Sequence, residues 1–111
     1  MVEVDKTNYD DVVLANEKPV LVDFWGPGCG KCFQMMPQIE ELEKTFSGKV
    51  VFAKMNIQGN RRLAIREQVM GLPTVIIYRG GEKIDTFSCD FSVEEIEEAL
   101  EEIEKKGNAG E

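Results

Sequence analysis

The sequence contains no histidine. Mechanisms that need an imidazole base, including those of the Cys-His hydrolases, are therefore excluded. Any proton transfer must use a carboxylate, a lysine, a tyrosine, a thiol or water. Three cysteines without histidine also fall short of the common structural zinc sites, which take four ligands from Cys and His. We therefore expect no metal site.

The sequence also lacks any apolar run that approaches the ~18 residues needed to span a membrane. Its first six residues are too charged for a signal peptide. Basic residues are outnumbered, 13 against 21 acidic ones, and the formal net charge of −8 argues against nucleic acid or an anionic membrane as a partner. We expect a cytoplasmic protein, in which a cysteine pair is more often catalytic or metal-binding than structural.

The length bounds the number of domains. A chain of 111 residues that is 42% hydrophobic, with no glycine- or proline-rich break, has enough core for one domain and no room for a second. We therefore expect residues 1–111 to form a single domain, with 107–111 as a flexible tail.

Cys29 and Cys32 stand between an apolar run that predicts a buried strand, 20–25, and the start of a helix. Two cysteines three residues apart project from one helical turn, so their sulfurs can bond to each other or lie as neighbouring thiols. The partial positive charge of a helix N-terminus lowers the pKa of the first cysteine. This arrangement describes a reversible dithiol/disulfide couple.

The other elements alternate along the chain in an order that predicts a mixed α/β sheet with helices on both faces, parallel strands first and antiparallel strands last. Functional sites in such folds lie at the carboxyl ends of the parallel strands. Cys29 directly follows such a strand in this chain. The expected elements are a strand at 2–4, a helix at 7–14 capped by Thr7, a helix from Cys32 to Phe46, a strand at 50–57, a helix at 60–69, a hairpin of 75–78 and 82–87 around Gly80-Gly81, and a helix capped by Ser92 that stops at Gly107.

Five stretches of the chain form a recognisable set: 18–25, Cys29-Gly30-Lys31-Cys32, Pro37, 53–57 and Leu72-Pro73-Thr74. A lone Cys-x-x-Cys motif is weak evidence, but the same motif with these neighbours is specific. Together the stretches resemble the thioredoxin family over nearly the whole chain, about residues 7–103.

The resemblance implies the thioredoxin fold and a thiol–disulfide oxidoreductase that reduces disulfides in other proteins. Such an enzyme uses its own Cys29–Cys32 pair and no bound cofactor, receives electrons from a separate reductase and is expected to be a monomer. Cys29 would be the attacking thiolate and Cys32 the resolving thiol. Pro73 would be a cis proline beside the cysteines, with Leu72 presenting backbone groups to the substrate.

The resemblance also implies that Asp23 is a buried acid below the cysteines, with Lys54 as its partner and Trp25 packed against the redox loop. Desolvation would raise the pKa of Asp23 and suit it to exchange a proton with Cys32, whereas Lys54 would oppose that shift. A purely structural Asp23, a solvated Lys54 and an ordinary trans Pro73 are the alternatives. The alternatives for Cys29 and Cys32 are a zinc ligand pair or a structural disulfide.

Three residues depart from the family pattern, two of them within its usual motif Trp-Cys-Gly-Pro-Cys and the third, Cys89, outside it. Gly28 removes an aromatic wall from the substrate surface, which also includes Trp25, Gly30, Leu72 and Pro73. Lys31 places a cation beside both sulfurs, which stabilises the thiolate and predicts a potential above the thioredoxin value of about −270 mV. Cys89 stands where the family usually has a glycine on the rim of the groove, as a tolerated small residue or a regulatory thiol.

Two other functions remain open on the sequence alone. One is a redox-sensing or scaffold module that binds a partner without turnover. The other is a more oxidising isomerase or glutaredoxin-like enzyme, which a high potential would favour.

Overall fold

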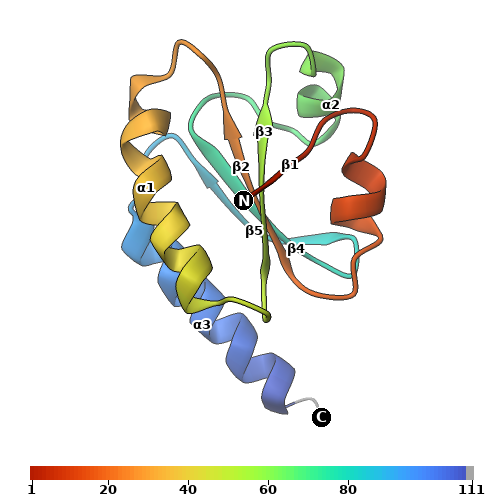
Figure 1. Ribbon diagram of the computed structural model, residues 1–111, viewed down its shortest axis with the longest axis vertical. Helices are drawn as coiled ribbons and strands as arrows, with labels where there is room; N and C mark the ends of the chain where they lie inside the picture. The colour runs from red at the N-terminus through yellow and green to blue at the C-terminus, as the bar shows by residue number, and fades with distance from the viewer. Residues whose placement is uncertain (110–111) are drawn as a thin grey trace.

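The chain forms a five-stranded sheet with helices on both of its faces (Figure 1). This computed structural model describes residues 1–109. In chain order, the elements are β1 (Val2–Glu3), η1 (Asp10–Leu14), β2 (Val20–Trp25), α1 (Gly30–Thr45), β3 (Val51–Asn56), α2 (Arg61–Arg66), β4 (Thr74–Arg79), β5 (Glu82–Ser88) and α3 (Val93–Ala109).

The strands lie in the order β1-β3-β2-β4-β5. The pairs β1–β3 and β3–β2 are parallel, whereas β2–β4 and β4–β5 are antiparallel. This confirms the predicted mixed sheet, in which parallel strands precede an antiparallel hairpin. Gly80 and Gly81 form the hairpin turn with φ of 61° and 82°, a conformation that costs glycine little.

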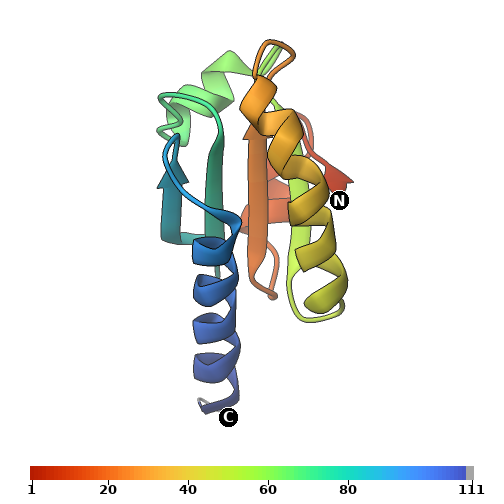
Figure 2. The ribbon, with the colours of Figure 1, turned by 90° about the vertical axis from the view of Figure 1, so that its left-hand side faces the viewer.

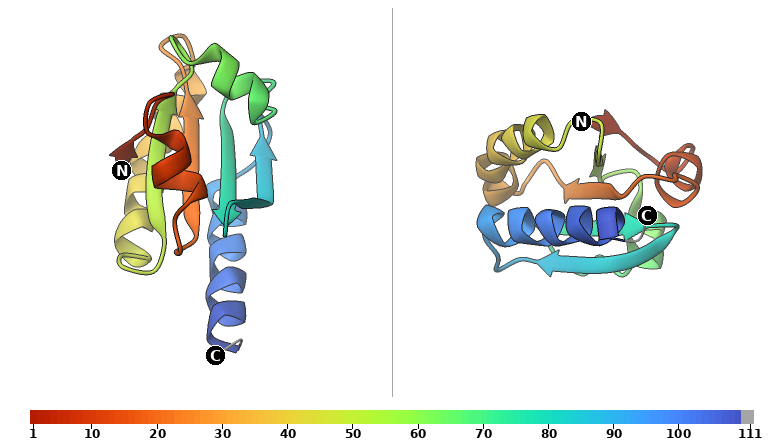
Figure 3. Two further views of the ribbon diagram at one scale, coloured as in Figure 1. Left: turned by 90° about the vertical axis from the view of Figure 1, so that its right-hand side faces the viewer. Right: turned by 90° about the horizontal axis from the view of Figure 1, so that it is seen from below.

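Alternate residues of the central strand β2 face two separate cores. Val20, Val22 and Phe24 pack with residues of η1 and α2, while Leu21 packs with residues of α1 and α3. Figure 2 shows α1 and α3 over one face of the sheet, and Figure 3 shows η1 and α2 over the other. Because β2 is covered on both faces, it is a rigid base for the loop that follows it.

A polar network joins the helices of the η1 and α2 face to the sheet. The buried hydroxyls of Tyr9 and Tyr78 lie 2.5 Å apart, and Tyr78 donates a hydrogen bond of 2.6 Å to Glu67. Arg66 donates to Glu67 at 3.0 Å and to Asp10 at 2.7 Å. One arginine thereby forms ion pairs with both Glu67 and Asp10.

The predicted N-cap at Thr7 is wrong. The helix begins at Asp10, its N-cap is Tyr9, and no side chain caps it. Thr7 instead directs its N–H and its hydroxyl to Asp5 Oδ1, at 2.8 and 2.5 Å. Since Asn8 accepts the Asp5 N–H at 2.7 Å, a side-chain-bonded turn over Asp5 to Asn8 takes the place of a helical first turn.

The predicted stop of the last helix at Gly107 is also wrong, because α3 continues to Ala109. An interior glycine costs a helix only about 1 kcal/mol, which is not enough to end it unaided. The rest of the predicted tail, 110–111, lies outside the described residues. The predicted start is confirmed, since the Glu95 N–H donates to Ser92 Oγ at 3.3 Å. Of the helices that the structure describes, none has the length and apolarity to cross a bilayer.

Candidate active site

The loop after β2 places Cys29 at the N-cap of α1. Cys29 has an extended backbone, its N–H donates to Gly26 O at 3.1 Å, and its Sγ accepts the Cys32 N–H at 3.1 Å. The Cys29 sulfur therefore stands in the position of a capping side chain, where free N–H groups and the helix dipole stabilise negative charge. Cys29 and Cys32 are joined by a disulfide.

The two sulfurs of the disulfide differ in exposure. Cys32 is 1% exposed and points into the protein, whereas Cys29 is only half-buried. A groove of about 710 Å³ lies beside the pair and is lined by Cys29 but not by Cys32. An external sulfur therefore has access to Cys29 and none to Cys32.

Asp23 lies in the middle of β2, on the same face of the sheet as Leu21 and therefore beneath α1. It is 2% exposed, and its Oδ2 is buried without a hydrogen-bond donor from the described residues. Burial raises the pKa of Asp23 to about 7, and the positive charge of Lys54 partly opposes this shift. The carboxyl group thus titrates near neutral pH.

Lys54 is the cross-strand neighbour of Asp23 in β3 and is half-buried. Within the described residues, no ion pair of 4.0 Å or less joins their side chains. Lys54 thus acts on Asp23 through its charge and not through a direct bond.

Trp25 ends β2 and packs edge-to-face against Phe33, with ring centroids 5.8 Å apart. Phe33 follows Cys32 on α1 and is 49% exposed. The two rings hold the start of α1 against the end of β2 and present an apolar surface next to the disulfide.

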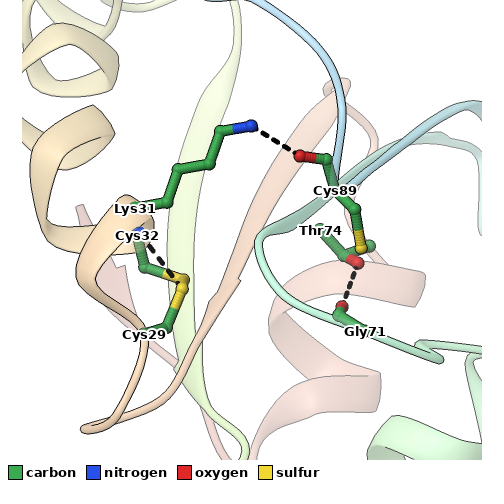
Figure 4. The surroundings of a disulfide bond; sticks show 6 residues. All are labelled: Cys29, Lys31, Cys32, Gly71, Thr74 and Cys89. Atoms are coloured by element: carbon green, nitrogen blue, oxygen red, sulfur yellow. Dashed lines mark hydrogen bonds between the residues drawn. A yellow bond between two sulfur atoms is a disulfide. The ribbon is translucent and has the colours of Figure 1, made fainter.

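A chain of hydrogen bonds runs from Pro73 through Cys89 to Lys31, and Figure 4 shows its link between Lys31 and Cys89 near the disulfide. The Leu72–Pro73 bond is cis. The Cys89 N–H donates to Pro73 O at 2.8 Å, and Lys31 Nζ donates to Cys89 O at 2.7 Å. Lys31 thereby ties the start of α1 to the rim of the cis-proline loop.

Cys89 is exposed and has a φ of 62°, in the left-handed region that favours glycine. Its Sγ lies against Gly71, where an added Cβ would approach the sulfur to 2.9 Å. The glycine at 71 therefore gives the Cys89 side chain its space. Among the described residues, Cys89 is the free cysteine.

The residues expected at the substrate surface fall into separate places. Gly28 and Leu72 line the groove with Cys29, whereas Lys31 and Cys89 bond to each other outside it. A side chain at Gly28 or Gly30 would meet nothing within 4 Å, so the loop is open there.

Sequence reasoning missed Phe33, Ile57 and Arg61. Ile57 and Arg61 line the groove from the segment after β3, and Phe33 covers Trp25. The sequence could have indicated Ile57 and Arg61, because they follow β3, a parallel strand beside β2. The segment after β3 therefore lies at the same edge of the sheet as Cys29. Within residues 1–109, no cluster of three or more His, Cys, Asp or Glu side chains is placed to hold a metal ion.

Comparisons with known proteins agree with this site. The family model described as Thioredoxin matches residues 1–102. A thioredoxin from Acetoanaerobium sticklandii is 49% identical over 85 residues, which cover 77% of this chain and 81% of the relative. A thioredoxin from Peptoclostridium acidaminophilum is 41% identical over 100 residues, covering 90% and 91%. A chloroplastic M-type thioredoxin from Zea mays is 42% identical over 83 residues, covering 75% of this chain and 50% of the relative.

The raised pKa of Asp23 predicts how stability depends on pH. Between about pH 4 and 7 the folded protein keeps the Asp23 proton and the unfolded chain has lost it, so the free energy of unfolding falls as pH rises. A pKa raised from its ordinary value to about 7 corresponds to an upper limit of about 4 kcal/mol in the free energy of unfolding. Urea unfolding of the oxidised protein at pH 5 and pH 8 measures this fall against Asp23→Asn, which lacks the titration. Equal pH dependence in both proteins would contradict the raised pKa.

Proposed function

The chain belongs to the thioredoxin family, and we propose that residues 1–111 form one thioredoxin-like domain in which the residues described above carry the steps of disulfide exchange. The fold is the thioredoxin fold, and the protein is a protein-disulfide reductase that uses a redox-active Cys-x-x-Cys pair and no cofactor. Protein disulfides are its substrates, and a disulfide reductase is its electron donor.

The exposure of Cys29 and the burial of Cys32 support the assignment of the two sulfurs. The Cys29 thiolate attacks one sulfur of the substrate disulfide, so that a mixed disulfide forms and the other substrate sulfur leaves as a thiolate. The Cys32 thiolate then attacks Cys29 Sγ, which closes the Cys29–Cys32 disulfide and releases the second substrate sulfur. Two electrons pass to the substrate, and its two thiolates each take up a proton.

Asp23 is proposed as the acceptor of the Cys32 proton in the second step. Its pKa of about 7 leaves a fraction of the carboxyl groups ionised at neutral pH. Asp23 also lies on the face of the sheet that α1 covers, and α1 carries Cys32. Lys54 is a positioning residue, because its positive charge lowers the pKa of Asp23 and so increases that ionised fraction.

The substrate chain is proposed to lie over Gly28 and Leu72 and to reach Cys29 through the groove, with Trp25, Gly30, Lys31, Pro73 and Cys89 around it. The open space at Gly28 and Gly30 would admit bulky substrate side chains. Cys89 is exposed on the rim and is proposed as a substrate contact, with a regulatory thiol as the other role open to it.

The cellular setting is proposed from the chemistry. A reductase needs a compartment in which its own pair is kept reduced, and the bacterial cytoplasm offers this. We propose that the protein works there as a monomer in electron transport from a reductase to protein disulfides.

The charge of Lys31 predicts a raised reduction potential. Its ammonium group is bonded to Cys89 O and not to a sulfur, but it belongs to the first turn of α1, and a positive charge there favours the Cys29 thiolate and therefore the reduced form. We expect the potential to lie above about −270 mV and to fall by on the order of 30 mV in Lys31→Met, as titrated against glutathione. Lys18→Met, which removes an exposed lysine before β2, is the control and should keep the wild-type value. A potential at or below about −270 mV in the wild type would rule out this effect.

The two cysteines have different expected phenotypes in insulin reduction. Cys29→Ser should lose all activity, because no other sulfur lines the groove among the described residues. Cys32→Ser should form a mixed disulfide with the substrate through Cys29 and fail to release it, which mass spectrometry detects. Equal turnover by the wild type and both variants would refute the assigned roles. Turnover by the wild type no faster than the uncatalysed rate would instead favour a binding module without turnover.

A further inference from the structure

We propose that the α2 surface, formed by Arg61, Arg62, Ile65 and Met70, binds an acidic segment of the substrate protein that continues from the disulfide in the active site. The proposal rests on the proposed function, because it assumes that a substrate polypeptide enters the groove beside Cys29. It adds the chemistry of that polypeptide, namely carboxylates interspersed with apolar side chains.

The α2 surface is continuous with the active-site groove. Arg61 and Leu72 line both the groove of about 710 Å³ and a second hollow of about 200 Å³, which extends along α2 past Ile65 to Met70. Arg61 also lines a third hollow of about 350 Å³ together with Arg62. A chain leaving Cys29 thus meets a continuous depression with Arg61 at its centre.

The arginines of α2 differ in their ionic partners. Arg66 is paired with Asp10 and Glu67, at 2.7 and 3.0 Å. Within the described residues, Arg61 and Arg62 are exposed and have no ion-pair partner. Two unneutralised cations next to the groove of a protein with a net charge of −8 are complementary to carboxylates on a bound chain.

Apolar side chains stand next to these cations. Met70 is 90% exposed and Ile65 is 69% exposed, and both line the hollow that Leu72 shares with the groove. Exposed apolar residues that adjoin each other and a binding groove mark an interaction surface more often than single ones do. An extended polypeptide that alternates acidic and apolar residues fits both features, whereas a nucleic acid would meet the acidic remainder of the protein.

The test compares two synthetic peptides, each with one intramolecular disulfide. In one, the disulfide is flanked by alternating Glu and Leu, and in the other by alternating Gln and Leu. We expect the wild type to reduce the acidic peptide with a kcat/KM about five-fold higher, since each exposed ion pair contributes about a two-fold factor or slightly more. The preference should fall toward one in 0.5 M salt, which screens exposed charges.

The variant Arg61→Gln/Arg62→Gln should bring the ratio of the two kcat/KM values close to one. Because both values in a ratio come from the same protein, a general change in the activity of a variant cancels. The control is Lys105→Gln/Lys106→Gln, which changes the net charge equally. This pair lies toward the end of α3, remote from α2 (Figure 1), and should keep the wild-type ratio.

A wild-type ratio near one, or a preference that survives in Arg61→Gln/Arg62→Gln, would overturn the proposal. A concentration-dependent dimer of the wild type that this variant abolishes in sedimentation would assign the surface to a second copy, and would overturn it as well. Failure to reduce either peptide would refute the proposed function itself, so the two failures are distinguishable.

Discussion

The capping of α1 by Cys29 is the interaction on which the active site depends. A sulfur that accepts the Cys32 N–H at 3.1 Å occupies the place where the helix most favours negative charge. The position is fixed by β2, a strand buried on both faces, and by the bond from the Cys29 N–H to Gly26 O. The rigid sheet thus brings one sulfur of the redox pair to the groove, and the first turn of the helix keeps the other sulfur inside.

The same sheet places an acid where packing alone would favour a hydrocarbon. Asp23 alternates with Leu21 on the face that α1 and α3 cover, so its carboxyl group is deprived of water. The resulting pKa of about 7 makes the charged form costly for stability at neutral pH. This cost and the pKa near neutrality are the reasons for proposing proton exchange, and not structural support alone, as the role of Asp23. Lys54, one strand away, tempers the shift without cancelling it.

The sequence predicted features that depend on local pattern. The apolar run of β2, the glycine turn of the hairpin and the Ser92 cap each have one strong local cause, and each is present. Thr7 failed as a cap because Asp5, two residues earlier, competes for its hydroxyl and its N–H. Arg61 and Phe33 were missed because their roles arise from contacts between segments distant in the chain, which no spacing in the sequence encodes.

Alkylation of the reduced protein tests most directly whether the helix start activates Cys29. The rate of reaction with iodoacetamide is measured from pH 4 to 10, and the modified peptide is identified by mass spectrometry. The account predicts that Cys29 reacts first, with an apparent pKa at least one unit below the ordinary thiol value of about 8.5, while buried Cys32 stays unmodified at neutral pH. Reaction of Cys32 first, or a Cys29 pKa at about 8.5, would contradict it.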